Sequence, residues 1–389
     1  MSKTRNLKSK IMWIWHAAVV AEYQKPLAEL AHYTDLDLGL LVPRRWPERA
    51  GQMVKAEGPV SSGYRLVKAR TAFTGLYYIY FYPTLLYQLL RSRPDVIYCY
   101  EEAHTLMAAL VLFLRRLFLP RSAVLLYAAQ NIRKHYPLPF RLFERYCFRR
   151  ANAILACGTS VASTLRSKGY RGALHVVPLP TDTAAYSPDP QKREAIRREL
   201  DLPADALVVG YAGKLVEEKG LRTLWKAFSH LADDCPNLHL VLMGGGPLKD
   251  ELQRAANSAG LADRLHMAGV IHNNELPAYL NALDIFVLAS ETRPNWREQF
   301  GRVVVEAMSC GVPVVGSDSG EIPAVIGDAG LIFPEGDSLH LASCLQTLFD
   351  PILRADLAGK GRERVLRNFS LETVAAQHYS IYQAMSAER

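Results

Sequence analysis

Two carboxylates, Glu298 and Glu306, have the types and spacing that most directly point to chemistry. They stand eight residues apart in the segment EQFGRVVVEAM, across the expected start of a helix at residues 300–310. Eight residues at about 1.5 Å each span roughly 12 Å, comparable to the distance from the sugar ring to the ribose of a nucleotide sugar. The helix N-terminus between them has unpaired N–H groups that favour a diphosphate, and Gly301 allows close backbone approach. The alternative is that Glu298 caps the helix and Glu306 is a solvated helix residue.

A loop with two lysines, GKLVEEKG at residues 213–220, lies between an expected strand and an expected helix. Positive charge at such a turn can neutralise a departing diphosphate. Lys214 and Lys219 are therefore candidates for a diphosphate site, although two lysines are also common in ordinary surface loops. The glycine run 244–246 before Pro247 follows a strand in the same way, and we interpret it as mostly structural.

The composition limits the choice of partners. The 46 Lys and Arg residues exceed the 38 Asp and Glu residues by eight, which fits a nucleotide diphosphate, an anionic membrane surface or nucleic acid. We expect no nucleic-acid partner, because no known nucleic-acid-binding motif occurs. We expect no metal site either, since the six cysteines lack CxxC spacing and the pair Asp233–Asp234 is typical of a helix end.

Parallel sheets are expected to position these residues. In the first half, apolar runs separated by helix-like segments predict buried strands at residues 11–15, 38–42, 95–100, 124–128 and 153–157. In the second half the alternation predicts strands at residues 206–212, 239–243, 266–270, 284–288 and 312–315. Each half is therefore an α/β, doubly wound, Rossmann-like unit.

The length of 389 residues suits two domains. We predict a first domain at 1–182, a proline-rich and charged linker at 183–205, a second domain at 206–368 and a C-terminal helix at 369–389. Ligands of open α/β sheets bind beyond the carboxyl ends of the strands, so we expect the two domains to face each other across a cleft. We interpret the run 11–20 as a first strand and not a signal peptide, and the apolar run 106–114 is too short to span a bilayer.

The segment around Glu298 and Glu306 resembles the EX7E motif of retaining GT-B glycosyltransferases, specifically the large family 4. The text that follows, AMSCGVPVVGSDSGEIPAVIGDAGLIFPEGD, resembles the continuation in that family. The resemblance covers residues 208–337 closely and the first half only in general layout. It implies a GT-B fold whose C-terminal helix crosses back to the first domain.

The resemblance also implies roles for individual residues. Glu298 would contact the transferred sugar, Glu306 would bind the ribose hydroxyls, and Lys214 and Lys219 would bind the diphosphate. The remaining donor-binding positions act through the backbone or flank the loop: Gly213, Val270, Ile271, Phe300, Gly301, Arg302 and Val303.

The acceptor side is less defined, because this chain departs from the family in its first half. The family often has a catalytic histidine after a strand, where this chain has Gln130 and Asn131, and HAAVVAEY replaces the usual Gly-rich loop after the first strand. The candidates here are Gln130, Asn131 and three histidines, His16, His104 and His135. For each histidine a structural role is the alternative.

The implied activity is metal-independent, retaining transfer of a hexose-type sugar from a nucleotide-diphosphate sugar to a saccharide or lipid-linked hydroxyl acceptor. No cofactor is expected, and the family favours UDP-sugars over GDP-sugars. The pathway implied is assembly of surface polysaccharide or glycolipid. The alternatives are a nucleotide-sugar epimerase or phosphorylase, and a catalytically inactive sugar-nucleotide-binding protein.

An aromatic segment at residues 71–93 and a set of arginines are expected on the first domain. The arginines are Arg115, Arg116, Arg141, Arg145, Arg149 and Arg150. Together they could dock an anionic membrane, and membrane-docked relatives use such surfaces. We therefore expect a cytoplasmic protein, peripheral at the inner face of the membrane; a helix core with solvated arginines is the alternative.

Overall fold

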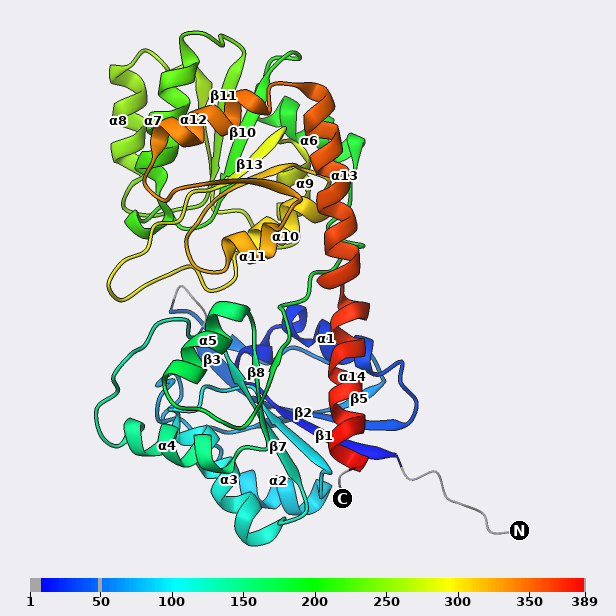
Figure 1. Ribbon diagram of the computed structural model, residues 1–389. Helices are drawn as coiled ribbons and strands as arrows, with labels where there is room; N and C mark the ends of the chain where they lie inside the picture. The colour runs from blue at the N-terminus through cyan, green and yellow to red at the C-terminus, as the bar shows by residue number, and fades with distance from the viewer. Residues whose placement is uncertain (1–7, 48–50, 388–389) are drawn as a thin grey trace. The chain divides into compact units, whose positions relative to one another are not determined.

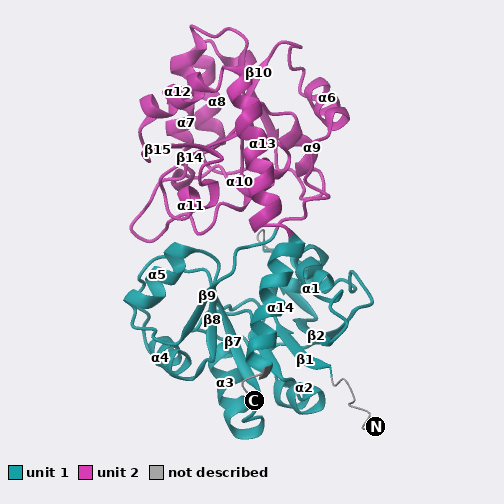
Figure 2. Cartoon of the chain, turned by 45° about the vertical axis from the view of Figure 1, so that its right-hand side comes forward, with its two compact units in different colours: residues 1–180, 371–389 teal, residues 181–370 magenta. Residues whose placement is uncertain are grey.

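The computed structural model describes residues 8–47 and 51–387. The chain forms two compact units (Figure 2). Unit 1 contains residues 1–180 and 371–389, and unit 2 contains residues 181–370. Each unit is built around one parallel sheet, as the sequence predicts.

Unit 1 contains a seven-stranded sheet in the order β5-β2-β1-β6-β7-β8-β9 (Figure 1). All paired strands are parallel, and the end of β1 is in register with β2 on one side and β6 on the other. The strands are β1 (Ser9–Ile14), β2 (Leu36–Pro43), β5 (Tyr64–Ala69), β6 (Val96–Cys99), β7 (Ala123–Ala128), β8 (Ala153–Ala156) and β9 (Ala173–Val176). A separate antiparallel hairpin pairs β3 (Arg45–Pro47) with β4 (Met53–Lys55).

The helices of unit 1 connect its parallel strands. They are α1 (Lys25–Leu30), α2 (Leu85–Ser92), α3 (Leu106–Phe118), α4 (Phe140–Arg150) and α5 (Thr159–Ser167), preceded by short 3-10 turns at Ala17–Val19 and Ala21–Gln24. The chain returns to unit 1 at its end as α14 (Leu371–Ala387), which packs on α1 and β6. Val374, Ala375 and Tyr382 of α14 lie in the core of this unit, which explains why a predicted C-terminal helix belongs to the first domain.

Unit 2 contains a six-stranded parallel sheet in the order β12-β11-β10-β13-β14-β15. Its strands are β10 (Leu207–Ala212), β11 (Leu238–Met243), β12 (Leu265–Gly269), β13 (Ile285–Leu288), β14 (Val314–Ser317) and β15 (Gly330–Phe333). β10, β11, β13 and β14 are buried at every residue, because helices cover both faces of a parallel sheet, whereas β12 at one edge is buried only at Leu265. The sequence predicts five of these strands and misses β15.

The longer helices of unit 2 are α6 (Pro190–Glu199), α7 (Leu221–Ala232), α8 (Lys249–Ser258), α12 (Ser338–Thr347) and α13 (Pro351–Asn368). Shorter ones are α9 (Leu276–Asn281), α10 (Arg302–Ser309) and α11 (Ile322–Ile326), with 3-10 turns at Glu217–Lys219 and Ala262–Arg264.

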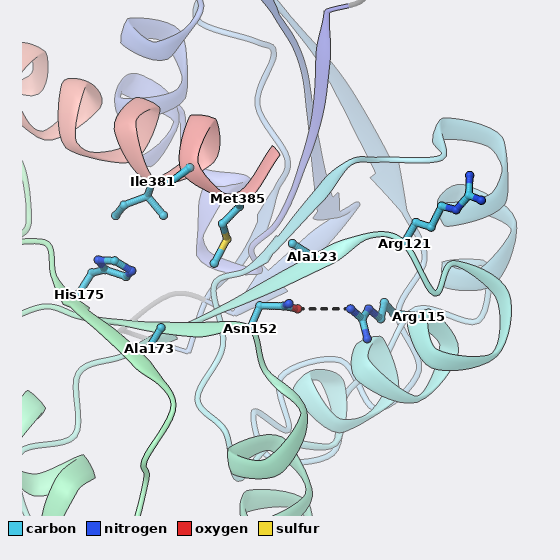
Figure 3. A pocket seen from close by; sticks show the side chains of 9 residues that line it. Arg115, Arg121, Ala123, Asn152, Ala173, His175, Ile381 and Met385 are labelled. Carbon is cyan, nitrogen blue, oxygen red and sulfur yellow. Dashed lines mark hydrogen bonds between the residues drawn. The ribbon is translucent and has the colours of Figure 1, made fainter. Parts of the chain in front are cut away.

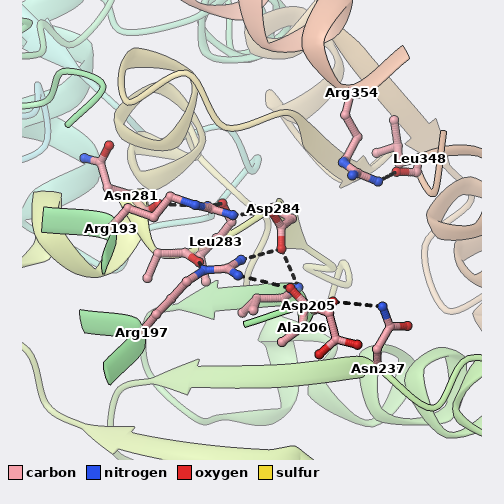
Figure 4. A network of polar contacts seen from close by, with 12 residues as sticks. Arg193, Arg197, Asp205, Ala206, Asn237, Asn281, Leu283, Asp284, Leu348 and Arg354 are labelled. Atoms are coloured by element: carbon pink, nitrogen blue, oxygen red, sulfur yellow. Dashed lines mark hydrogen bonds and ion pairs between the residues drawn. The ribbon is translucent and has the colours of Figure 1, made fainter. Parts of the chain in front are cut away.

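The predicted linker 183–205 contains α6, which belongs to unit 2. Asp284 just before β13 binds Arg193 and Arg197 of α6, each at 2.6 Å (Figure 4). Asp284 also accepts the Val208 N–H at 2.7 Å, so one carboxylate ties the helix to the sheet. The charges of this segment are therefore part of a packed unit, although in the sequence they are typical of a solvated connection.

Candidate functional site

The site in unit 2 begins where the sheet reverses its strand order, between β10 and β13. The loop after β10 carries the lysines, and the loop after β13 carries Glu298. Because both strands run parallel, both loops leave the same edge of the sheet. This is the point where open α/β sheets bind ligands.

Glu298 and Lys219 meet at this edge. The Lys219 Nζ donates to Glu298 Oε2 at 2.6 Å, and the Ser290 hydroxyl donates to the same oxygen at 2.8 Å. Lys219 Nζ also lies 4.8 Å from the centre of the Trp296 ring, which is within cation–π range. Glu298 is 9% exposed, so its carboxylate is buried, paired and held in one orientation.

Close backbone packing fixes the loops around this pair. A Cβ on Gly220 would lie 1.8 Å from the Ala289 carbonyl oxygen, and one on Gly320 would lie 1.9 Å from the Glu298 carbonyl oxygen. Both glycines have positive φ, at 64° and 61°. The Glu321 N–H donates to the Glu298 carbonyl at 3.2 Å, which holds the backbone from the other side.

Glu306 lies inside α10, and it is not a solvated helix residue. It is 6% exposed, and its Oε1 lies 3.0 Å from Arg302 Nε one turn earlier. Glu298 does not cap this helix, because α10 begins at Arg302 after Gly301, which has φ of 78°, and the structure records no side-chain cap. The helix starts two residues later than predicted, so residues 298–301 are not helical. The estimate of roughly 12 Å between Glu298 and Glu306 assumed a helical rise throughout, and that rise applies only from Arg302 onward. Both alternatives, a capping role for Glu298 and a solvated position for Glu306, are therefore wrong.

The other predicted donor-side residues surround the same edge. Lys214 is exposed directly after Gly213, while Val270, just beyond β12, is 75% exposed and Ile271 next to it is partly buried. A Cβ on Gly244 would lie 1.8 Å from the Gly213 carbonyl oxygen, so the predicted glycine turn packs on the lysine loop. That contact supports the structural interpretation of the glycine run.

Phe300, Arg302 and Val303 lie at the start of α10. Phe300 is 4% exposed and packs against Phe369 with ring centres 5.9 Å apart. The first N–H groups of any helix lack intrahelical partners, so the backbone at Arg302 and Val303 suits an anion.

Sequence reasoning missed Ser290 and Trp296, which complete the surroundings of Glu298 and Lys219. Ser290 follows the predicted strand 284–288 by two residues, and that position after a buried strand was the available signal. Trp296 gives no spacing signal, because only the folded loop brings it over Lys219.

In unit 1, the predicted candidates lie on the loops after β1, β6 and β7. His16 lies beyond β1, and its Nδ1 is 2.6 Å from Oε1 of Glu101, which follows β6 and was not predicted. His104 is 4% exposed and stacks on Tyr136 with ring centres 4.0 Å apart; burial lowers its pKa to about 3. The ring of Tyr77 lies 5.3 Å from His16 and 6.4 Å from His104.

Gln130, Asn131 and His135 follow β7, which is next to β6 in the sheet, so they leave the same sheet edge as His16. The Gln130 N–H donates to Glu102 Oε1 at 3.0 Å, and its own side-chain oxygen accepts the Ile132 N–H. Asn131 is buried and His135 is exposed. Burial raises the Glu102 pKa to about 7, against the lowering effect of the backbone N–H groups of Ala129 and Gln130.

A cavity of about 520 Å³ opens at the opposite edge of the unit 1 sheet (Figure 3). Its walls include the starts of β7 and β9, the end of α3 and the last turns of α14, with Arg115, Asn152 and His175 among its polar side chains. None of the predicted site residues lines it. Among residues 8–47 and 51–387, no three His, Cys, Asp or Glu side chains form a group that could hold a metal ion.

Solved structures share the fold of this protein over nearly the whole chain. Sucrose-phosphate synthase from Thermosynechococcus elongatus matches with a TM-score of 0.74 at 21% identity, covering 98% of this chain and 100% of that one. The Anabaena protein HepE in complex with UDP and glucose matches with a TM-score of 0.69 at 20% identity, covering 97% of this chain and 100% of that one. The two Rossmann-like units are thus those of the GT-B fold.

The match to a known sequence family falls in unit 2. Residues 192–364 match the family described as "Glycosyl transferases group 1", a segment that lies wholly inside unit 2 and includes both Lys219 and Glu298. A 2-deoxystreptamine glucosyltransferase from Streptomyces kanamyceticus is 29% identical over 62% of this chain and 62% of its own length. The lipopolysaccharide core biosynthesis glycosyltransferase LpsE from Rhizobium meliloti is 31% identical over 58% of this chain and 63% of its own. The chain therefore spans less than two thirds of these relatives.

Proposed function

We propose that this chain is a retaining glycosyltransferase that moves a hexose-type sugar from a nucleotide-diphosphate sugar to a hydroxyl acceptor. The observation that carries the proposal is the pair of partly buried Lys219 and buried Glu298 at the strand-reversal edge of unit 2, next to the start of α10. The similarity of residues 192–364 to glycosyl transferases supports the same reaction class.

Each group of the site has a role in this reaction. Lys214, Lys219 and the α10 N-terminus stabilise the diphosphate as the anomeric C–O bond breaks. Glu298 accepts hydrogen bonds from hydroxyls of the transferred sugar, and Glu306 accepts them from the ribose. The acceptor hydroxyl attacks from the face that the diphosphate leaves, and a leaving phosphate oxygen takes its proton.

The lysines also support metal-independent transfer, because they place positive charge where the diphosphate charge develops. EDTA is then expected to leave the transfer rate unchanged. UDP-glucose is the first donor to test, since HepE was solved with UDP and glucose. Relatives that act in lipopolysaccharide core biosynthesis and on phosphatidylinositol mannoside make surface polysaccharide or glycolipid the proposed product class.

Glu298→Gln tests the site. The amide forms no ion pair with Lys219 and is a weaker acceptor, so we expect transfer to fall by roughly 100-fold or more, as when one transition-state contact is removed. Steady-state kinetics with UDP-glucose, and NMR of the product anomer, measure the rate and the retained configuration.

The matched control is Glu251→Gln. Glu251 is in the same unit and also pairs with a cation at 2.6 Å, but the pair with Arg222 is on the surface. Full activity of Glu298→Gln would refute the site assignment. Conversion of UDP-glucose to another nucleotide sugar without an acceptor would identify an epimerase, and donor binding without any transfer would identify an inactive binding protein.

An anionic membrane surface is the proposed second partner, through unit 1. Several large apolar side chains of α2, α3, α4 and the segment just before α4 are exposed: Tyr87, Leu90, Phe113, Leu117, Phe118, Leu138 and Leu142. Arginines on α3 and α4, including Arg116 and Arg145, accompany them. Apolar side chains with nearby arginines suit an interface of anionic lipids. Within the described residues, no helix has the length and hydropathy to cross a bilayer.

Vesicle flotation tests this partner. We expect binding to vesicles containing phosphatidylglycerol, weakened by salt and by the double change Leu117→Ser and Phe118→Ser, with neutral phosphatidylcholine vesicles as the control. Equal binding to both vesicle types, or none to either, would refute it.

A further inference from the structure

Unit 1 contains a buried carboxylate that the donor site does not use. Glu101 is fully buried, and its Oε1 accepts two hydrogen bonds, from His16 Nδ1 at 2.6 Å and from the Tyr80 hydroxyl at 2.5 Å. Its Oε2 is also buried and has no partner among residues 8–47 and 51–387.

This hydrogen-bond pattern contributes little to the stability of the fold, but it holds the His16 ring in one orientation. A buried carboxylate that serves stability needs both oxygens satisfied, because an unpaired buried oxygen keeps its desolvation cost. Here both donors converge on the oxygen that holds the His16 ring. The arrangement fixes Nδ1 as the donating nitrogen, so Nε2 is the atom left for a ligand.

The position of the pair is that of a ligand site. His16 follows β1 and Glu101 follows β6, and the order of the sheet reverses between these two strands. Ligands of open α/β sheets bind at this reversal, beyond the carboxyl ends of the strands. The unit 2 pair, Lys219 and Glu298, occupies the equivalent point in its own sheet.

Aromatic rings surround His16. Its ring centre lies 4.8 Å from Trp46, 5.3 Å from Tyr77 and 5.7 Å from Tyr80. The His16 side chain nevertheless remains 18% exposed, so a ligand can reach it. A few fixed polar atoms among aromatic walls are typical of small-molecule sites, and a sugar presents hydroxyls and apolar C–H faces to such walls.

We propose that His16 Nε2 binds a hydroxyl of the saccharide acceptor, and that Glu101 and Tyr80 are positioning residues that hold the imidazole for it. A hydroxyl both donates and accepts, so it suits the ring nitrogen in either protonation state. This inference rests on the proposed function, because it assigns the acceptor to unit 1 while the donor binds to unit 2.

The experiment measures transfer from UDP-glucose to three probes: 2-deoxystreptamine, myo-inositol and methyl α-D-glucoside. His16→Phe keeps a ring in the aromatic setting, and Glu101→Gln keeps the shape of the carboxylate without its charge. We expect each to raise the acceptor KM roughly 10- to 100-fold, the size of one hydrogen bond to a fixed polar group, with donor KM unchanged. Tyr80→Phe removes one donor to Glu101 Oε1 and should give a smaller rise in the acceptor KM. This variant replaces Glu101→Gln in the test if Glu101→Gln does not fold.

NMR of the ¹⁵N-labelled histidine rings gives a readout that a purely structural role would not move. His16 should carry its proton on Nδ1, lose that fixed state in Glu101→Gln, and shift at Nε2 when the transferred probe is added. His32→Phe is the control, because His32 forms a similar pair with Glu29 at 3.1 Å with 73% of its side chain exposed.

The outcomes separate this inference from the proposed function. If the wild-type protein transfers glucose and the His16 and Glu101 variants keep its acceptor KM, only this inference is overturned. It is also overturned if the variants raise donor and acceptor KM equally and lower the melting temperature, which marks a structural role. If the wild-type protein neither transfers to any probe nor gains thermal stability from UDP-glucose, the proposed function fails and this inference fails with it.

Discussion

At the scale of single residues, burial and pairing separate the chemically distinctive groups from ordinary ones. Glu298 and Glu306 belong to a type that is mostly solvated, yet each is under 10% exposed and each faces a cation. Glu101 is a third such residue, with a histidine and a tyrosine as partners. His104, by contrast, is enclosed and stacked on Tyr136, which fits the structural alternative.

Glu102→Gln tests the raised carboxyl pKa in unit 1. A folded pKa of about 7, above the usual 4.5, means that the contribution of Glu102 to stability is fully present below pH 4.5 and is lost as the pH rises through 7. Glutamine keeps an oxygen to accept the Ala129 and Gln130 N–H groups and does not titrate. The difference in free energy of unfolding between the variant and the wild type should therefore shift in favour of the variant, by on the order of 1–3 kcal/mol, when the pH is raised from 5 to 8.5.

Thermal unfolding at the two pH values measures this gain. The surface control is Glu363→Gln, whose carboxylate pairs with the exposed Arg367. A stability difference between Glu102→Gln and wild type that is the same at both pH values would contradict the assignment.

At the scale of elements, loops that leave parallel strands carry the chemistry, and glycines allow them to pack. Gly220 ends the lysine loop and starts α7, with the Ala289 carbonyl of the β13 loop against its Cα. The distance between Lys219 and Glu298 depends on that approach, since these residues are on the same two loops. The short 3-10 turn Glu217–Lys219 and the left-handed Gly220 thus position the cation.

Gly220→Ala should separate the two loops. The added Cβ would lie 1.8 Å from a backbone oxygen at φ of 64°, so both overlap and backbone strain destabilise unit 2, by several kcal/mol. Gly260→Ala is the matched control: its φ is 67°, but nothing lies within 4 Å of the added Cβ, and strain alone costs about 1 kcal/mol. Melting temperatures compare the two, and equal shifts would contradict the steric argument.

At the scale of the whole molecule, the chain builds each unit from its own sheet but completes unit 1 with its last helix. Tyr382 of α14 is fully buried, and Tyr379 stacks on Tyr33 with ring centres 4.0 Å apart while its hydroxyl donates to Asp35. His378 of the same helix packs against Trp13 of β1. Unit 1 is therefore discontinuous in sequence, whereas unit 2 is one continuous segment.

Removal of residues 371–389 should therefore affect the units unequally. Unit 1 loses buried Val374 and Tyr382, each worth about 1.5–3 kcal/mol, and should become sensitive to protease. Unit 2 keeps its core, and UDP should still protect it from proteolysis. A shorter deletion after Gln383 keeps Tyr382 and is the control; loss of UDP protection in the longer deletion would contradict the independence of unit 2.

The sequence alone determined the two parallel sheets, because strands buried on both faces form continuous apolar runs. It also singled out Lys219 and Gly301, which lie in loops, and Glu306, which lies in α10. It did not reveal β5, β9 or β15, whose outer positions leave mixed burial patterns. Nor did it place α6 in unit 2, since only the fold brings Asp284 to Arg193 and Arg197. The tertiary structure alone decided which side chains meet: Lys219 with Glu298, 79 positions apart, and His16 with Glu101, 85 positions apart. Parallel strands bring distant loops to one edge, and local sequence patterns do not encode that separation.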